Sequence, residues 1–288
     1  MKKNRAMRIA VLLLALLAGL IVPGLDDRLN VVHYAIDAEE ITVPVRIALV
    51  TDLHSCAYGE GQRELIDAVD AENPDIVLLG GDIFDDKLPD DKAKAFLAGI
   101  ADRYPCWYVT GNHEHWAGKR RFARQMDILD ELDIARLGGQ AILYAADGQR
   151  FTLCGVDDPM QWNGSEKEYK KQVQNLTGAE GFTVLLAHRP EYAAFYAECG
   201  FSLVLAGHAH GGQWRVPGLI NGLFAPNQGF FPQYAGGSYR IGDTTLIVSR
   251  GLARESTRLP RVYNRPELVI VELTNGAGQG VQTEKGEP

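Results

Sequence analysis

Five apolar runs, each ending in residue types that bind metal ions, are the feature that most constrains this chain. The runs span residues 45–51, 75–79, 106–110, 183–187 and 202–206. Short apolar runs that end in glycine or polar turns predict buried strands. Ligands of open α/β sheets bind beyond the carboxyl ends of the strands. We therefore expect the polar residues that follow these runs to converge: Asp52, His54, Asp82, Asn112, His113, His188, His208 and His210.

Helical spacing of apolar residues separates the first three runs, over residues 62–71 and 91–104. This β-α-β-α-β order predicts a parallel sheet with right-handed crossovers, and so an α/β fold. Asp147 and Gly148 predict a hairpin turn. The remaining predicted elements are helices over residues 119–132, 166–175 and 191–198, and strands over residues 31–34, 142–145, 150–155, 238–241, 244–250 and 267–273.

The chain has 288 residues, 46% of them hydrophobic, which is enough for one or two domains. One domain is favoured, because the five strand ends must meet and no Ser/Pro-rich linker separates them. The formal net charge of -8 argues against a nucleic-acid-binding surface, where a basic patch is expected. The four cysteines form no C-x-x-C pair, which argues against a disulfide framework or a cysteine zinc site.

The amino-terminal segment resembles a membrane signal. Basic residues from Lys2 to Arg8 precede an uncharged run over residues 9–25. This order is typical of a signal peptide or an uncleaved signal anchor. No clear A-x-A cleavage site follows, which favours an anchor and an extracytoplasmic domain; an apolar helix of a soluble protein is the weaker alternative. The expected organisation is an anchor or signal peptide over residues 1–29, a domain over residues 45–274 and a flexible tail over residues 275–288.

The residue types at the strand ends suit particular metal ions. Aspartate and asparagine offer oxygen and histidine offers neutral nitrogen, a mixture that fits Mn, Fe or Zn better than Mg or Ca. There are too many such residues for one tetrahedral ion, but enough for two if one carboxylate bridges them. Two ions about 3.5–4 Å apart can hold a hydroxide for in-line attack and neutralise phosphate oxygens. The sequence therefore predicts two divalent ions and phosphoester hydrolysis.

The same residues, in the same order, form motifs that resemble the calcineurin-like metallophosphoesterase superfamily: Asp52-x-His54, Gly81-Asp82-x-x-Asp85, Gly111-Asn112-His113-Glu114, His188 and Gly207-His208-x-His210. The resemblance covers roughly residues 45–273. It implies a four-layer α/β/β/α sandwich of two mixed sheets flanked by helices. Residues 207–213 and 249–252, with the amino-terminal run, are similar to a bacterial membrane-associated branch, some members of which cleave phosphodiesters or the pyrophosphate of nucleotide-linked lipids. Ala209 departs from the usual Thr, at a position that does not bind metal.

The resemblance also implies roles for individual residues. Asp82 would bridge the two metals. His113 would protonate the leaving oxygen or grip the phosphate, and Asp85 would orient that histidine. The first metal would be held by Asp52, His54 and His210, and the second by Asn112, His188 and His208.

Several other residues have two open interpretations. Arg189, Arg250 and Arg254 could clamp a second phosphate or be structural, and the structural reading is favoured for Arg254. His115 could reach the substrate or be a supporting or surface group. The aromatic residues of a Gly- and Pro-rich stretch over residues 218–237 could contact substrate or pack on one another.

Taken together, the sequence predicts a metallophosphoesterase that cleaves phosphodiesters or pyrophosphates. The expected substrates are small phosphorylated or lipid-linked molecules of the cell envelope, with membrane contact through the amino-terminal segment. The alternatives are a phosphomonoesterase or an inactive membrane-anchored binding protein. Inactive copies usually lose ligands, and here every expected ligand position is filled, which favours an enzyme.

Overall fold

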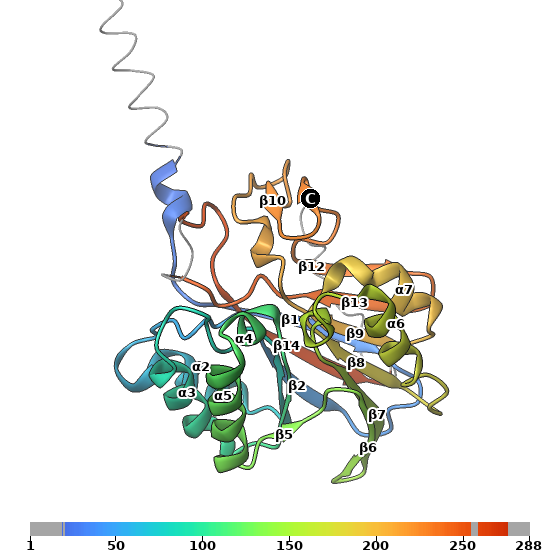
Figure 1. The fold of residues 1–288 in the computed structure, drawn as a ribbon. Helices are drawn as coiled ribbons and strands as arrows, with labels where there is room; N and C mark the ends of the chain where they lie inside the picture. Colours follow the sequence, from blue (N-terminus) through green and yellow to red (C-terminus); the bar gives the residue numbers. More distant parts are fainter. Residues whose placement is uncertain (1–18, 20, 255–258, 276–288) are drawn as a thin grey trace, which may run out of the picture.

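The computed structural model describes residues 19, 21–254 and 259–275, and Figure 1 shows their arrangement. Residues 1–18 and 20 of the predicted anchor and residues 276–288 of the predicted tail lie outside the described residues. Within the described residues, no helix combines the length and the apolar character needed to cross a membrane.

The first sheet is built mainly from the amino-terminal half of the chain. The strand order of this sheet is β1 (Asn30–Asp37), β14 (Glu267–Thr274), β2 (Val45–Val50), β3 (Ile76–Gly80), β4 (Cys106–Val109) and β5 (Ala135–Arg136). Strands β2, β3, β4 and β5 are parallel, β14 runs antiparallel to β2, and β1 is parallel to β14. The short helix η1 (Val22–Leu25) precedes the sheet. The helices that cover its outer face are α2 (Arg63–Glu72), α3 (Asp91–Ala101) and α5 (Lys119–Glu131), with η2 (Glu60–Gln62) before α2.

The second sheet comes from the later part of the chain. Strands β7, β8, β9 and β13 are parallel, and the predicted hairpin joins β6 to β7. Its strand order is β12 (Gly237–Ile241), β13 (Thr244–Val248), β9 (Leu203–Ala206), β8 (Thr183–Ala187), β7 (Gln149–Val156) and β6 (Gln140–Ala146). The helices on its outer side are α6 (Glu166–Gln174) and α7 (Ala193–Glu198), with the short helices η3 (Pro159–Trp162) and η4 (Pro190–Tyr192).

The two sheets pack face to face, and this packing defines the layers. Ile47 and Leu49 of the first sheet share one buried cluster with Leu186 and Leu205 of the second. A separate cluster joins the first sheet to its helices, and a third joins the second sheet to α6 and α7. These three clusters lie between four layers, so the expected α/β/β/α sandwich is confirmed.

The structure differs from the sequence prediction in a few elements. Strand β1, predicted over residues 31–34, is longer and pairs with β14, so the first sheet begins upstream of the predicted domain boundary at residue 45. Helix α3 ends at Ala101 rather than at residue 104, since the residue before Pro105 is disfavoured in a helix. The stretch after β9 contains a small hairpin of β10 (Phe224–Ala225) and β11 (Gly229–Phe230), which the sequence prediction lacked.

Candidate metal centre

The predicted ligand residues converge where the carboxyl ends of the two sheets meet. Backbone hydrogen bonds join the loops that follow β2 and β3. Asp52 N donates to Gly81 O at 3.0 Å, and His54 N donates to Asp82 O at 2.8 Å. The Asp52 carboxylate reaches the second sheet and accepts a hydrogen bond from His208 N at 3.0 Å. The sandwich therefore brings together side chains that are far apart in the sequence.

Three groups of possible metal ligands lie side by side in this position. Their ligand atoms lie within 4.8 Å of one another in each group. Asp82 lies near two of the groups, because its Oδ2 atom lies 3.6 Å from His54 Nε2 and 3.1 Å from His188 Nε2. The groups are Asp52, His54 and His210; Asp82, His188 and His208; and His54, Asp85 and His113.

Hydrogen bonds indicate which histidine nitrogens are available as ligands. His188 Nδ1 donates to the carbonyl oxygen of Gly80 at 2.9 Å, which leaves the lone pair on Nε2. Nε2 of His208 lies 3.0 Å from both Asn227 Oδ1 and Arg189 Nη1, so Asn227 favours a proton on Nε2 whereas Arg189, which can only donate, favours a lone pair there. Nδ1 of His208 and Nε2 of His188 lie 3.2 Å apart, so a single cation could contact both nitrogens.

Several buried polar atoms of the site have no hydrogen-bond partner among the described residues. Buried polar atoms are rarely left in this state, because the free energy cost is high. The unpartnered atoms include His54 Nε2, Asp82 Oδ2, Asn112 Oδ1 and His210 Nδ1. Carboxylate, amide and imidazole atoms that converge in this way fit divalent cations, so the residues present suit the metals that the motifs imply.

Burial keeps two of the second-sheet histidines, His208 and His210, in the neutral form. Burial lowers the pKa of His208 and His210 well below the ordinary value, with the neighbouring Arg189 and His54 charges adding to the effect. Neutral imidazole is the form that binds metal. Asp82 behaves oppositely: burial raises its pKa, but the charges of His188 and His54 hold it well below the usual range. Burial lowers the pKa of His188, but the charge of Asp82 and a hydrogen bond to it outweigh burial and raise that pKa to about 10. The site therefore presents His208 and His210 in the neutral form beside an ionised Asp82, and a metal ion would have to displace the proton of His188.

The backbone of the site is held in an unusual conformation. Non-glycine residues rarely adopt positive φ angles, and such strain is concentrated at functional sites. Two glycines allow the loops to approach, since a Cβ at Gly111 would lie 2.2 Å from Asp82 Oδ1 and one at Gly207 2.4 Å from Asp52 Oδ2. The candidate ligands with positive φ are Asp52, His54, Asp82, His208 and His210.

His113 lies at the open edge of this site. Its side chain is 21% exposed, whereas that of His188 is fully buried, so substrate can reach His113 from solvent. Its Nδ1 atom lies 2.7 Å from Asp86 Oδ1 and 3.4 Å from Asp85 Oδ2. Burial lowers the pKa of His113, but hydrogen bonds to Asp85 and Asp86 and the charge of Asp82 outweigh it and raise the pKa to about 9.

The sequence prediction assigned the orientation of His113 to Asp85, and the structure adds a second carboxylate. Asp85 Oδ2 lies 3.2 Å from His54 Nδ1, so Asp85 stands between two histidines. Asp86 makes the shorter contact with His113. Sequence reasoning missed Asp86, although its position directly after the Asp82-x-x-Asp85 motif was a usable signal.

Replacing Asp86 tests this arrangement. In Asp86→Asn we expect the pKa of His113 to fall from about 9, because one of the groups that raise it is neutralised. The protonated acid is lost as pH rises through that pKa, so the alkaline limb of the pH–rate profile should move to lower pH. Profiles of metal-loaded enzyme would be compared with those of Asp91→Asn, which alters an exposed carboxylate. An unchanged alkaline limb would contradict the role of Asp86.

Glu114 is the second residue whose importance appears only in the structure. It is fully buried and accepts hydrogen bonds from the backbone N–H groups of Gly111, Asp82 and Phe84 at 2.8–3.1 Å. Tyr108 Oη also donates to it at 2.7 Å. Glu114 therefore fixes the turn before Asn112 to the loop that carries Asp82, within the short helix α4 (Asn112–Trp116).

The structure assigns structural contacts to two of the arginines. Arg189 is buried and forms an ion pair with Asp158, with Nη2 3.1 Å from Oδ1. Arg250 Nε lies 3.4 Å from Glu267 Oε2. Both guanidinium groups are held by carboxylates of the protein, which agrees with the structural interpretation.

Arg254 and His115 are also held by protein groups. Arg254 stacks over the ring of Tyr58 at 4.0 Å. His115 Nε2 lies 3.0 Å from Thr110 Oγ1, and its ring stacks on Phe122. Burial lowers the pKa of His115, which keeps it neutral. These contacts favour a supporting role for His115.

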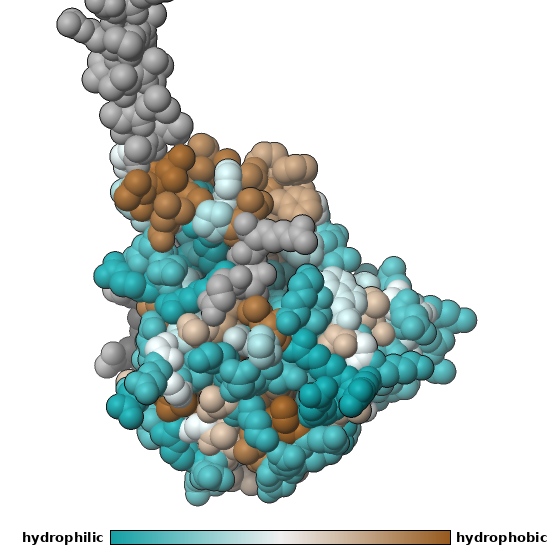
Figure 2. Space-filling view, turned by 60° about the vertical axis from the view of Figure 1, so that its left-hand side comes forward, coloured by the Kyte–Doolittle hydropathy of each residue, from teal (hydrophilic) through white to brown (hydrophobic). Residues whose placement is uncertain are grey.

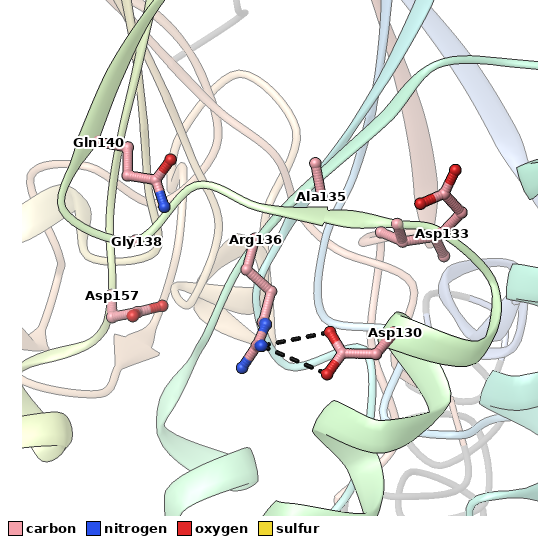
Figure 3. Close-up of a pocket in the computed structure, with 8 residues that line it drawn as sticks. Asp130, Asp133, Ala135, Arg136, Gly138, Gln140 and Asp157 are labelled. Carbon is pink, nitrogen blue, oxygen red and sulfur yellow. Dashed lines mark hydrogen bonds and ion pairs between the residues drawn. The ribbon is translucent and has the colours of Figure 1, made fainter.

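An open cavity of about 620 Å³ lies elsewhere, near β5 (Figure 3). Arg136 and Asp130 pair across it, and Asp157 lines it. Asp157 Oδ1 already accepts hydrogen bonds from the backbone and hydroxyl of Thr110 at 2.9 Å. No histidine lines this cavity, so it lacks the mixed ligand set of the metal centre.

Comparison with known proteins agrees with this geometry. A family model described as calcineurin-like phosphoesterase matches residues 45–212, more than half of the chain. The chain belongs to the calcineurin-like phosphoesterase family. It is therefore a metal-dependent enzyme that hydrolyses phosphoesters, and the predicted superfamily is confirmed.

Three curated relatives of this phosphoesterase are similar over most of its length. Phosphodiesterase YaeI of Escherichia coli is 30% identical over 80% of this chain and 82% of its own. The metallophosphoesterase YkuE of Bacillus subtilis is 28% identical over 79% of this chain and 78% of its own. A zebrafish (Danio rerio) transmembrane protein with a metallophosphoesterase domain is 27% identical over 92% of this chain and 63% of its own.

Proposed function

We propose that this phosphoesterase is a dinuclear phosphodiesterase or pyrophosphatase that acts on envelope or lipid-linked substrates. The proposal of two metal ions rests on the position of Asp82 Oδ2, which lies 3.6 Å from His54 Nε2 and 3.1 Å from His188 Nε2. Preference for diesters is supported by the similarity to a relative named a phosphodiesterase. Two divalent ions, when bound, supply an activated water and charge neutralisation for the phosphoryl oxygens.

In this proposal one set of residues binds the two ions and another provides the general acid. Asp52, His54 and His210 hold one ion, and Asn112, His188 and His208 hold the other, with Asp82 shared between them. Asp85 and Asp86 contact Nδ1 of His113, so Nε2 is the nitrogen left to carry the proton that the substrate receives. With a pKa of about 9, His113 is protonated at pH 7 and can give its proton to the leaving oxygen.

We also propose that the amino-terminal run anchors the enzyme to the cell membrane, with the catalytic domain outside the cytoplasm. Basic residues before an uncharged run over residues 9–25 support this placement. A relative over 92% of the chain is named a transmembrane protein. An anchored enzyme would meet lipid-linked substrates at the membrane surface.

The test compares two soluble substrates. The full chain in detergent would be stripped of metal and reloaded with Mn, Fe or Zn, and turnover of bis-p-nitrophenyl phosphate compared with that of p-nitrophenyl phosphate. We expect diester turnover that depends on added metal, with about two ions bound per chain at full activity. Faster monoester turnover would support the phosphomonoesterase alternative. No turnover with metal verified in the protein would contradict the proposed substrate class.

A further inference from the structure

An exposed apolar surface lies beside the metal centre and is not used by the proposed chemistry. It is formed by the loop after η5 (His210–Gly212). Figure 2 shows hydrophobic side chains gathered on this part of the molecule. We call this surface the apolar rim, and its members are Trp214, Val216, Leu219, Phe224, Phe230 and Phe231, with exposed fractions from 41% to 75%.

The segment that carries the apolar rim has almost no charged side chains. Between residues 214 and 237 the only charged side chain is Arg215, which is buried. Charged residues make up 23% of the whole chain. Phe231 has a φ angle of 55°, which is unfavourable for an aromatic residue, and its ring is 67% exposed. A strained, uncharged and exposed apolar loop is typical of an interaction surface rather than of ordinary protein surface.

The apolar rim is continuous with the end of the amino-terminal run. Tyr263 N donates to the carbonyl oxygen of Gly24 at 2.6 Å, and Val262 forms a β-bridge with Trp214. Val22 and Leu25, at the end of the run, are 65% and 43% exposed. The described end of the run, residues 22–25, therefore lies at the same face as the apolar rim.

The opposite side of the same loop reaches the metal centre. Asn227 Oδ1 lies 3.0 Å from His208 Nε2, and Leu223 N donates to Gly212 O at 2.9 Å, two residues after His210. Phe224 and Phe230, whose rings pack at 5.4 Å, stand on the short hairpin that flanks Asn227. One loop thus joins the candidate ligands to an exposed apolar surface.

We infer that the apolar rim docks on the lipid bilayer and places the metal centre at the membrane surface. Aromatic and aliphatic side chains without nearby charge suit the interface between headgroups and acyl chains. The absence of acidic residues from the rim also prevents repulsion from anionic headgroups. Docking would present phosphoesters of the headgroup region to the site, which deepens the proposed function and rests on it, whereas docking itself does not depend on catalysis.

Quenching by brominated lipid tests docking without any measurement of turnover. The full chain would be reconstituted in nanodiscs of phosphatidylcholine with or without bromine on the acyl chains, and tryptophan fluorescence compared. Trp214 belongs to the apolar rim, whereas Trp162 packs against Tyr169 near η3. We expect Trp214→Phe to remove at least half of the quenching and Trp162→Phe to leave it unchanged.

A second variant keeps the test independent of Trp214 itself. Leu219→Asp combined with Phe230→Asp should reduce quenching of Trp214 at least twofold, whereas Leu143→Asp, on the distant strand β6, should not. Quenching that falls by less than half in Trp214→Phe, or that is absent from the wild-type chain, would overturn the docking proposal. A stable dimer in which these aspartates cause dissociation would overturn it as well, because a second copy would then cover the rim.

A turnover measurement separates docking from the proposed substrate class. The double variant should hydrolyse soluble bis-p-nitrophenyl phosphate at the wild-type rate, since neither residue is a candidate ligand. Turnover of a phosphodiester carried by a lipid in nanodiscs should fall at least fivefold. Normal quenching without turnover of either substrate would support docking while contradicting the proposed function.

Discussion

Asp82→Asn should remove most bound metal and lower turnover by a factor on the order of 10³ or more. Metal ions contribute several kcal/mol of transition-state stabilisation, and about 4 kcal/mol corresponds to that factor. The structural reason is that Asp82 Oδ2 approaches both histidine groups, at 3.6 Å from His54 Nε2 and 3.1 Å from His188 Nε2. A neutral amide cannot replace a carboxylate shared by two cations. Metal content by mass spectrometry and turnover of bis-p-nitrophenyl phosphate measure the two effects.

A matched control separates loss of the bridge from a general loss of charge. Asp130→Asn removes an aspartate whose side chain is 57% exposed and pairs with Arg136. We expect this variant to keep its metal and its rate, because surface ion pairs contribute little. If Asp82→Asn retained both ions at full occupancy, the bridging assignment would be wrong, whatever the rate.

His113→Ala should keep both metals and lose about 10²–10⁴-fold in rate, the usual contribution of a general acid. His113 belongs to the group of Asp85 and His54, and it lies at the exposed edge of the site with 21% of its side chain accessible. The loss should be smaller for a p-nitrophenyl ester than for an alkyl ester. Nitrophenolate is a good leaving group and needs little protonation.

The pH dependence provides a second readout for His113. The wild-type rate should fall as pH rises through the pKa of His113, about 9, and this limb should be absent from His113→Ala. His33→Ala is the matched control, because His33 is 52% exposed and pairs with Glu72 away from the site. A His113→Ala protein that has lost its metals would show that His113 is a ligand and not the acid.

Much of the fold follows from local sequence patterns. The apolar runs at residues 76–79 and 183–187 form the buried strands β3 and β8, since a strand covered on both faces reads as a continuous apolar segment. The predicted ends of helices and strands were less accurate, as for α3, because capping and the residue before a proline decide where a helix ends. The hairpin of β10 and β11 has only two residues in each strand, too few for a periodic pattern.

The sequence by itself determined which residues could hold metal, because ligand residue types recur directly after apolar runs and a strand delivers its next residues to the end of its sheet. Only the tertiary structure decided how these residues combine. Asp82 can lie between His54 and His188 only after the two sheets pack face to face. The same holds for Asp86 and His113, and for the loop that joins Asn227 to the apolar rim. These contacts depend on distances between segments far apart in the chain, and local patterns carry no information about such distances.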